Sequence, residues 1–537
     1  MTTKKKNSNY KLQFDNRFTR LLPGESEQLN QPRQVFQACY SRVKPLQPSQ
    51  PALIIYASEV AELLNFPTDF CTSQTFEDIF SGKLLLPEMD PHASCYGGHQ
   101  FGHWAGQLGD GRAINLGELL NDSHEHWMLQ LKGAGPTPYS RSGDGLAVLR
   151  SSIREFLCSE AMFHLGIPTT RALSLVLSGN KVMRDMFYDG HKKLESGAVV
   201  CRAARSFIRF GSFQIFTARQ EIKTVQQLLD HSIRHDFPHL GEPDKSCYLN
   251  WFRAVTLSTI HMVVEWMRVG FVHGVMNTDN MSVLGLTIDY GPYGWLEGYD
   301  PDWTPNTTDR EMHRYSFGNQ GDVAGWNLAR LAEAIVPIIG EAEPLQALLN
   351  EYAIHYKSAW QNMMANKLGL VSFTEPDDSQ LVDALEKILT LSEIDMSIFY
   401  RKLANIDATI DPEQCSDSQL IAPLMDAYYT PATLTEPTKI ATANWLRRYI
   451  HRLQQDGLDN IKRKTTMNRH NPKYVLRNYL CQIAIDQAEA GDYSEIHRLH
   501  QLLKKPYDEQ VDYESYASKR PEWARERAGC SMLSCSS

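Results

Sequence analysis

The pattern of apolar and polar positions predicts strands in the first part of the chain and helices in the rest. Residues 52–66, ALIIYASEVAELLNF, begin as a short apolar strand and continue with helical spacing. Residues 126–133, HWMLQLKG, alternate between polar and apolar side chains, which predicts a strand ending near Lys132. Residues 197–216 are also strand-like, with basic residues between apolar ones. These segments predict a sheet built from the N-terminal part of the chain.

Helical spacing appears first in residues 145–166 and dominates from about residue 320 onward. Gly166 and Pro168 are expected to end the first of these helices. A second helix is predicted over residues 249–270. Strands followed by helices indicate an α+β fold with a two-lobed character. We expect an N-terminal extension over residues 1–90, a core over 91–350 and a mostly helical C-terminal region over 351–537.

The composition is that of a globular protein and does not indicate a nucleic-acid or membrane partner. The 537 residues are 42% apolar and 22% charged, and the formal net charge is -9. The chain has no run of 18 apolar residues, so no membrane span is predicted. The N-terminus lacks the apolar segment of a secretory signal. Ten scattered cysteines are typical of a reducing compartment, so we expect a cytoplasmic protein.

A glycine- and histidine-rich stretch, residues 85–119, predicts loops that end in a hairpin around GDGR. Gly109 and Gly111 would allow a nucleotide phosphate to approach the backbone, and Arg112 would add a positive charge. Gly-Asp-Gly is also an ordinary turn, so this motif is weak alone. The nearby His92, Cys95, His99 and His103 could suit zinc, but an ordered loop with hydrogen-bonded histidines is the favoured interpretation.

Lys132 and Glu155 have the positions expected of an ion pair beside ATP. Lys132 ends a predicted strand, as the ATP-contacting lysine of kinases does. Glu155 lies on the following helix and would hold the lysine toward the phosphates. The alternatives are a solvated lysine and a surface glutamate. Arg202 and Arg209, in the strand-like CRAARSFIRF, match phosphate oxygens in chemistry, although outward-facing arginines would fit the spacing equally.

The stretch FVHGVMNTDNMSVLGLTIDYGP, residues 271–292, is similar in spacing to the catalytic centre of a kinase. Asn280 and Asp289 offer hard oxygen ligands for Mg²⁺ or Mn²⁺, and Asp289 is predicted to lie at the end of a strand. Val275 occupies the position of the kinase base. Asp279 is the nearby carboxylate that could accept a proton from an attacking hydroxyl.

Long stretches of the chain resemble the selenoprotein O / YdiU family, from about residue 30 to the C-terminus. The matching stretches are YGGHQFGHWAGQLGDGR, LQLKGAGPTPYSRSGDGLAVLRSSIREFLCSEAM, LGIPTTRALSLV, FVHGVMNTDNMSVLGLTIDYGPYGWLEGYDP and RYSFGNQ. The resemblance implies a protein-kinase-like fold with the nucleotide bound in a flipped orientation. It also implies protein AMPylation, in which AMP passes from ATP to Ser, Thr or Tyr hydroxyls and pyrophosphate is released. UMP transfer from UTP, associated with some bacterial relatives, is a second option.

The resemblance assigns roles to residues of this chain through the matching motifs. Glu155 would orient Lys132, Asp279 would accept the proton, and Asn280 and Asp289 would bind the metal. The residues expected around ATP are Gly109, Gly111, Arg112, Lys132, Asp144, Gly145, Arg202, Arg209 and Asp289.

The C-terminus departs from the family pattern. Cys535 stands where eukaryotic members can carry selenocysteine, and a thiol is less acidic and less reactive than a selenol. Some bacterial members are thought to tie this cysteine to the loop after the metal-binding Asp, but residues 293–309 contain no cysteine here. Cys530 is an alternative partner for Cys535, and two free thiols are a nearly equal alternative.

Two other functions remain open from the sequence. A normally oriented nucleotide would present its γ-phosphate and make the protein a kinase. The valine at position 275 instead motivates a catalytically inactive, nucleotide-binding scaffold.

Overall fold

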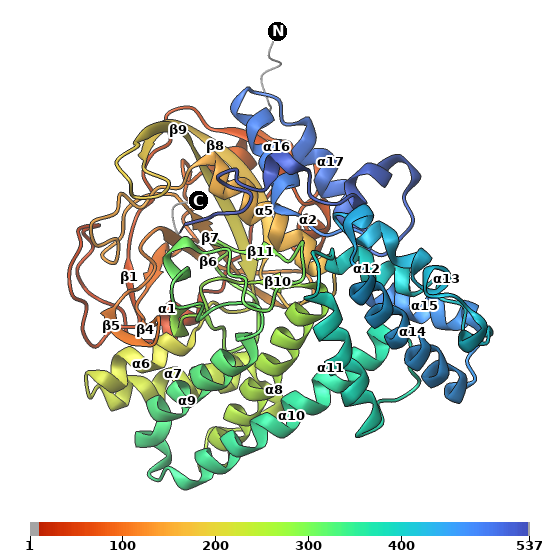
Figure 1. The fold of residues 1–537 in the computed structure, drawn as a ribbon. Coiled ribbons are helices and arrows are strands. Elements are labelled where there is room, and N and C mark those ends of the chain that lie inside the picture. Colours follow the sequence, from red (N-terminus) through yellow and green to blue (C-terminus); the bar gives the residue numbers. More distant parts are fainter. Residues whose placement is uncertain (1–9, 535–537) are drawn as a thin grey trace.

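A seven-stranded antiparallel sheet is the largest β-structure in the computed structural model, which describes residues 10–534 (Figure 1). Its strand order is β1-β3-β6-β7-β9-β8-β2. The strands are β1 (Tyr40–Arg42), β2 (Ala52–Tyr56), β3 (His92–Ser94), β6 (Ala113–Leu120), β7 (His126–Lys132), β8 (Arg171–Arg184) and β9 (Lys193–Ala204). Both edge strands come from the first 90 residues, so the N-terminal segment is an integral part of the sheet.

The glycine- and histidine-rich stretch contains more regular structure than predicted. Its hairpin is formed by β4 (Gly97–Gln100) and β5 (His103–Gln107), which lie next to GDGR instead of around it. The predicted hairpin around GDGR is therefore wrong. GDGR connects β5 to β6, and β6 pairs with β3 and β7.

The helix predicted over residues 145–166 is confirmed as α5 (Leu149–His164), which packs against β8 and β9. The helix predicted over 249–270 is confirmed as α8 (Lys245–Val269), which begins after the Asp244 cap and ends at a left-handed Gly270. The other helices of the main body are α1 (Arg17–Leu21), α2 (Ser58–Leu63), α3 (Thr68–Cys71), α4 (Gln74–Phe80), α6 (Phe210–Ala218), α7 (Ile222–Asp236), α9 (Gln320–Ile339) and α10 (Glu343–Leu368).

The strand-like segment 197–216 is a strand only in its first half. β9 ends at Ala204, and α6 begins at Phe210. Arg209 is the residue before this helix, where its backbone N–H donates to the Ser212 hydroxyl at 3.2 Å. The assignment of Arg209 to a strand is therefore wrong. The apolar residues of Phe210–Phe216 are buried on all sides, and a helix buried all round has no amphipathic period to reveal it.

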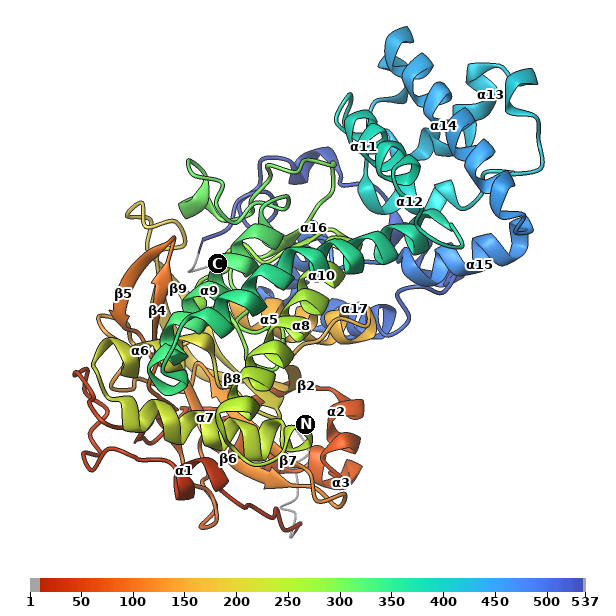
Figure 2. The same cartoon turned by 90° about the horizontal axis from the view of Figure 1, so that it is seen from below.

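The C-terminal helices form two groups (Figure 2). The first group projects away from the sheet and packs around a second hydrophobic core, to which α8 and α10 also contribute. It comprises α11 (Asp377–Leu389), α12 (Met396–Leu403), α13 (Asp417–Ile421), α14 (Glu436–Asp456) and α15 (Asn460–His470). The chain then returns to the main body, where α16 (Asn478–Glu489) and α17 (Ser494–Leu503) pack on α5. Residue 351, the predicted start of the C-terminal region, lies inside α10.

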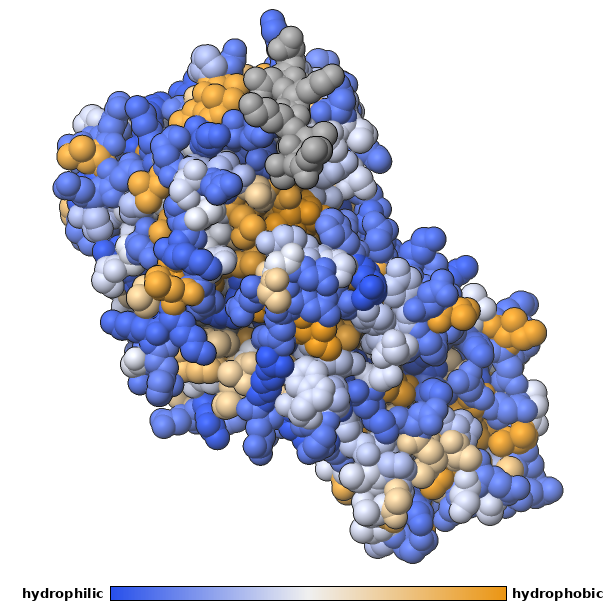
Figure 3. Space-filling model, turned by 90° about the horizontal axis from the view of Figure 1, so that it is seen from above, coloured by the Kyte–Doolittle hydropathy of each residue, from blue (hydrophilic) through white to orange (hydrophobic). Residues whose placement is uncertain are grey.

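Figure 3 shows the projecting helices as a smaller body beside the larger one, with hydrophilic residues over most of this face. Among residues 10–534, no helix has the length and apolar character needed to cross a membrane. An antiparallel sheet followed by many helices confirms the predicted α+β class.

Candidate active site

Most of the predicted site residues line one cleft with a volume of about 740 Å³. They come from the sheet, from the loops after β5 and β7, and from the segment after α8. The residues brought together are Gly109, Gly111, Arg112, Lys132, Asp144, Gly145, Arg202, Arg209, Asp279, Asn280 and Asp289, with Val275 among them. Segments up to 180 residues apart in the chain therefore meet at this cleft.

Two strands and α5 position a buried group of charges in the cleft. Lys132 is the last residue of β7, and its Nζ donates to Glu155 Oε2 on α5. Arg202 on β9 donates to Glu155 Oε1 at 2.9 Å. Gln130 lies two residues before Lys132 on β7, so the two side chains share one face of the sheet. Gln130 is also opposite Arg202 in the β7–β9 register, and its side chain accepts a hydrogen bond from Arg202. The carboxylate of Glu155 thus joins two buried cations.

Asp289 contacts Lys132 and Arg202 and also a third buried cation, Arg209. Its Oδ1 accepts from Arg202 at 2.7 Å and lies 3.6 Å from Lys132 Nζ, and its Oδ2 accepts from Arg209 Nη1. Burial disfavours the charge of Asp289, but the cations outweigh this effect and hold the pKa of its carboxyl well below the usual range. The same burial lowers the pKa of Lys132.

The backbone at Asp289 differs from the predicted strand end. Thr287 makes an isolated bridge to Thr169, and Asp289 then has a left-handed φ of 57°. Such a conformation is uncommon for a residue with a side chain and is frequent at functional sites. The buried His273 ring contacts the carbonyl of Ile288 at 3.0 Å, which holds the backbone just before Asp289.

Asp279 also lines the cleft and lies in a short 3-10 helix, Thr278–Asn280. Gln100 Nε2 donates to its Oδ2 at 3.4 Å, whereas its buried Oδ1 has no hydrogen-bond partner in the described part of the chain. Burial raises the pKa of Asp279 to about 6, against the opposing charge of Arg209. This carboxylate is therefore more basic than an ordinary aspartate, and one of its oxygens is buried without a hydrogen-bond partner among the described residues.

Asn280 is oriented with its amide oxygen available. Its Nδ2 donates to the Val275 carbonyl at 3.0 Å, so the side chain is fixed through its nitrogen. The remaining oxygen, with the Asp289 carboxylate, forms a donor set suited to a hard divalent cation.

The GDGR loop packs tightly against Tyr139. Gly109 has a φ of 73°, and a Cβ on it would overlap the Tyr139 ring. A Cβ on Gly111 would lie 2.8 Å from the Tyr139 carbonyl oxygen. Thr137 Oγ1 donates to the Asp110 carbonyl at 2.7 Å. These contacts fix the loop in a shape that only glycines allow at these two positions.

Asp144 and Gly145 lie at the mouth of the cleft. Both oxygens of Asp144 accept from Arg184, at 2.7 and 2.8 Å. Gly145 has a φ of 71° and lies against the Gly135 backbone, where a Cβ would not fit. Arg184 was not found from the sequence, because it lies on β8, 40 residues from Asp144.

Two further residues of the cleft, Asp110 and Tyr96, also escaped sequence analysis, as did Gln130, which contacts Arg202 from below the cleft surface. Asp110 Oδ1 lies 3.6 Å from Arg209 Nη2 and accepts from the Tyr96 hydroxyl at 3.3 Å. The Arg209 guanidinium lies over the Tyr96 ring, 4.6 Å from its centroid. Asp110 stands inside the GDGR motif, but the motif indicated a turn and not a carboxylate facing an arginine.

Cys530 is buried, and burial raises the pKa of its thiol to about 12. Its carbonyl accepts from Asn478 Nδ2 at 2.8 Å. The proposed partner, Cys535, lies outside the described residues.

The histidine and cysteine residues near GDGR take separate positions. His92 Nδ1 bonds to the Asp90 carbonyl at 2.9 Å and its ring stacks on Phe18, whereas the His99 ring lies against Trp104.

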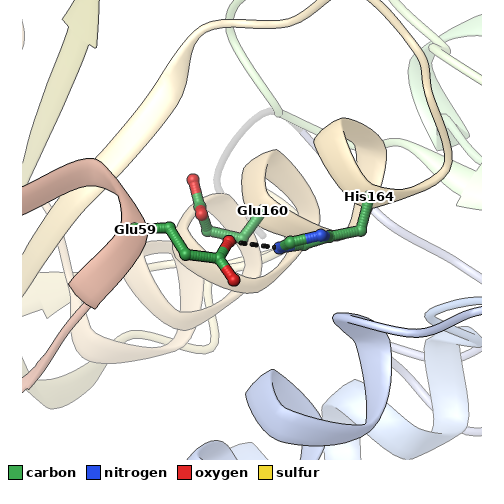
Figure 4. Close-up of side chains that lie close together, drawn as sticks. All are labelled: Glu59, Glu160 and His164. Carbon is green, nitrogen blue, oxygen red and sulfur yellow. Dashed lines mark ion pairs between the residues drawn. The ribbon is translucent and has the colours of Figure 1, made fainter. Parts of the chain in front are cut away.

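Within residues 10–534, the one group with metal-like spacing is Glu59, Glu160 and His164 (Figure 4). Arg171 occupies both oxygens of Glu160, at 2.9 and 2.6 Å, and Lys504 lies 3.6 Å from Glu59. Arg171 and Lys504 already supply the positive charge that a metal ion would bring to these carboxylates. The group is therefore an ion-pair network linking α2, α5 and the end of α17.

The chain is similar to known proteins over nearly its whole length. The model of the family described as "Protein adenylyltransferase SelO" matches residues 28–504. A protein of Rhodopirellula baltica named "Protein nucleotidyltransferase YdiU" is 55% identical, over 98% of this chain and 100% of its own length. Proteins of the same name from Azoarcus and Flavobacterium johnsoniae are 54% and 52% identical, each over 98% of this chain and 99% of their own length.

The family model covers most of the chain, including the whole cleft, and the relatives align nearly end to end. The predicted resemblance is confirmed: the chain belongs to the SelO family of protein adenylyltransferases.

Proposed function

We propose that this protein transfers AMP from ATP to Ser, Thr or Tyr hydroxyls of other proteins and releases pyrophosphate. The observation that carries the proposal is the cleft itself. It joins three buried cations, a candidate metal-ligand pair and Asp279, within a chain of the SelO family.

The cations and the glycine loop would bind the triphosphate. Lys132, Arg202 and Arg209 meet at Asp289, and Gly109 and Gly111 leave their backbone open to the cleft. Arg112 also lines the cleft, and no carboxylate of the described residues lies within ion-pair distance of its guanidinium. Its charge is therefore available to phosphate oxygens.

The chain's oxygen donors fit a divalent cation, Mg²⁺ or Mn²⁺. Asn280 and Asp289 would hold it, and Asp279 lines the same cleft. Such an ion neutralises phosphate charge and fixes the nucleotide. Because Arg202 and Arg209 hold both oxygens of Asp289, phosphates that attract these guanidinium groups would release the carboxylate.

Asp279 would accept the proton of the acceptor hydroxyl. The hydroxyl oxygen forms a bond to the α-phosphorus, the bond from that phosphorus to the β-phosphate bridging oxygen breaks, and pyrophosphate leaves with the electron pair. A pKa of about 6 keeps Asp279 mostly ionised at neutral pH while making it a stronger base than a solvated aspartate. Lys132, Arg202 and Arg209 would stabilise the charge on the leaving group.

We also infer a two-lobed, protein-kinase-like arrangement with a flipped nucleotide. The sheet with α5 would be one lobe, carrying Lys132 and Glu155, and the segment after α8 would belong to the other, carrying Asp279 and Asp289. The cytoplasmic location and the lack of nucleic-acid and membrane partners stay predictions.

Labelled nucleotides test the function. The protein is incubated with acceptor proteins, Mg²⁺ or Mn²⁺, and ATP labelled on either the α- or the γ-phosphate. Protein-bound α-label is the expected result, whereas γ-label would identify a kinase and no label a scaffold. Repeating the assay with α-labelled UTP determines the nucleotide preference. Asp289→Ala should abolish transfer, and undiminished labelling would contradict the metal assignment.

A further inference from the structure

An open pocket of about 370 Å³ lies outside the nucleotide cleft and shares no residue with it. It is formed by the loop before α9 and the first turns of that helix. Its lining residues are Met312, Arg314, Asn319, Asp322, Val323 and Trp326. We call this the α9 pocket. None of the nucleotide-binding roles proposed above uses it.

The α9 pocket and Asp279 are fixed to the same hairpin, β4–β5. Phe101 and Gly102 form its two-residue turn, both with positive φ. On one side of the turn, Gln100 donates to Asp279 at 3.4 Å. On the other side, Gly102 lies against Arg314, where a Cβ would stand 3.4 Å from the guanidinium carbon. The hairpin therefore holds the candidate base and the pocket in a defined relation (Figure 2 shows β4 and β5 beside α6 and α9).

Tyr315 strengthens this connection. Its hydroxyl accepts from the Phe101 backbone N–H at 2.8 Å and donates to Asn277 at 2.6 Å, two residues before Asp279. The rings of Phe101 and Tyr315 are 5.2 Å apart. The loop that carries Arg314 is thus hydrogen-bonded to the loop that carries the base.

The α9 pocket combines positive charge with exposed apolar surface. The guanidinium groups of Arg314 and Arg330 lie 4.7 and 5.1 Å from the centroid of the Trp326 ring. Arg330 pairs with Glu333 at 2.6 Å, whereas no carboxylate in the described part of the chain, Asp322 included, lies within ion-pair distance of Arg314. Met312, at the rim, has 66% of its surface exposed. The complementary ligand is an acidic side chain next to an apolar one.

We propose that the α9 pocket binds a segment of the acceptor protein, with an acidic residue on Arg314 and an apolar neighbour on Met312 and Trp326. This inference rests on the proposed adenylyl transfer, because the acceptor hydroxyl must reach Asp279. The path from Asp279 to Arg314 runs through the two turn residues of the hairpin and the contact at each end, and it is about 10–15 Å long. An extended chain rises about 3.3 Å per residue, which places the acidic residue roughly three to five positions from the acceptor.

A peptide library tests the pocket. Each peptide carries one central Ser, Thr or Tyr and has Asp, Lys or Leu at a single flanking position, and transfer is followed with α-labelled ATP. The unaltered protein should prefer Asp over Lys at one position three to five residues away by about fivefold, the upper range for an exposed ion pair. Arg314→Glu should reverse this preference, and Arg314→Gln should remove it.

Arg310→Glu is the matched control, because Arg310 is exposed, four residues away and outside the pocket lining. It should keep the preference for Asp. ATP affinity, measured by calorimetry, should be unchanged in all three variants, which shows that the cleft is folded. If the Arg314 variants bind ATP and keep the original preference, the inference is wrong. If the unaltered protein transfers no α-label to any peptide, the proposed function is contradicted and the inference is refuted with it.

Discussion

Glu155 provides the sharpest test of the charge group in the cleft. Its side chain is buried, with 2% of its surface exposed, and accepts from both Lys132 and Arg202. Glu155→Gln keeps the shape and one acceptor oxygen but removes the negative charge between two buried cations. Removing one partner of a buried ion pair typically costs about 3–5 kcal/mol. We expect a loss of about 3 kcal/mol in the free energy of unfolding of the nucleotide-free protein, since glutamine still accepts one hydrogen bond.

Nucleotide should reverse part of this loss. The phosphates bring negative charge to Lys132 and Arg202, so saturating ATP is expected to stabilise the variant more than the unaltered protein. Turnover should nevertheless fall by about 100-fold, because Lys132 loses the partner that orients it. Urea unfolding with and without ATP measures the first effect, and α-label transfer measures the second.

Glu160→Gln is the matched control. Glu160 lies on the same helix, is equally buried and accepts from Arg171 at 2.9 and 2.6 Å, but it does not line the cleft. It should lose comparable stability without preferential recovery in ATP. The reasoning is refuted if Glu155→Gln unfolds within about 1 kcal/mol of the unaltered protein. Equal recovery of both variants in ATP would also refute it.

Three further predictions concern the base, the glycine loop and a buried histidine. Asp279→Asn should lower turnover at least about 100-fold while the ATP dissociation constant, measured by calorimetry, stays within about threefold; a tenfold or smaller loss of turnover would show that Asp279 is not the base. Gly109→Ala should weaken ATP binding, because the added Cβ has no room beside Tyr139. Gly190→Ala is the control, since Gly190 also has a positive φ but has no atom within 4 Å of an added Cβ, and it should bind ATP normally. Equal ATP affinities in the two variants would contradict the loop's role. Burial lowers the pKa of His500 to about 3. The unfolded chain therefore takes up a proton near pH 6.5 that the folded protein does not, and this side chain should cost ~2 kcal/mol of stability as the pH falls from 7.5 to 5. His500→Leu should remove that dependence in unfolding curves, and an unchanged pH dependence would contradict the assignment.

Local patterns predicted the parts of the site that depend on local structure. The alternation of β7 and the helical period of α5 placed Lys132 and Glu155 on facing elements, and the structure shows them in contact. Arg209 could not be placed in this way. Its position depends on the end of β9 and on a bridge to Ser282, more than 70 residues away. Pairings over such distances leave no periodic signal in the sequence.

Asp289 illustrates a second limit. The apolar residues before it predicted a strand, but the segment makes one bridge and then a left-handed residue. A non-glycine residue in this conformation is held by tertiary contacts, here by Arg202, Arg209 and the His273 contact to Ile288. Sequence propensity does not report such contacts. The residue type and its spacing were sufficient to find the position but not its geometry.

The glycines of YGGHQF explain how the proposed base at position 279 would replace one at position 275. The 3-10 helix Thr278–Asn280 lies directly against β4, where a Cβ on Gly98 would stand 2.8 Å from Asp279 Oδ1. His99 anchors the contact by donating its backbone N–H to the Thr278 hydroxyl at 2.7 Å. Close approach to Gly98, which has no side chain, removes water from Asp279 and raises its pKa, and it leaves Oδ1 buried without a hydrogen-bond partner among the described residues. Val275, meanwhile, is buried and holds Asn280 through its carbonyl. The valine therefore contributes to the orientation of a candidate metal ligand, and the basic carboxylate is supplied by the turn that β4 accommodates.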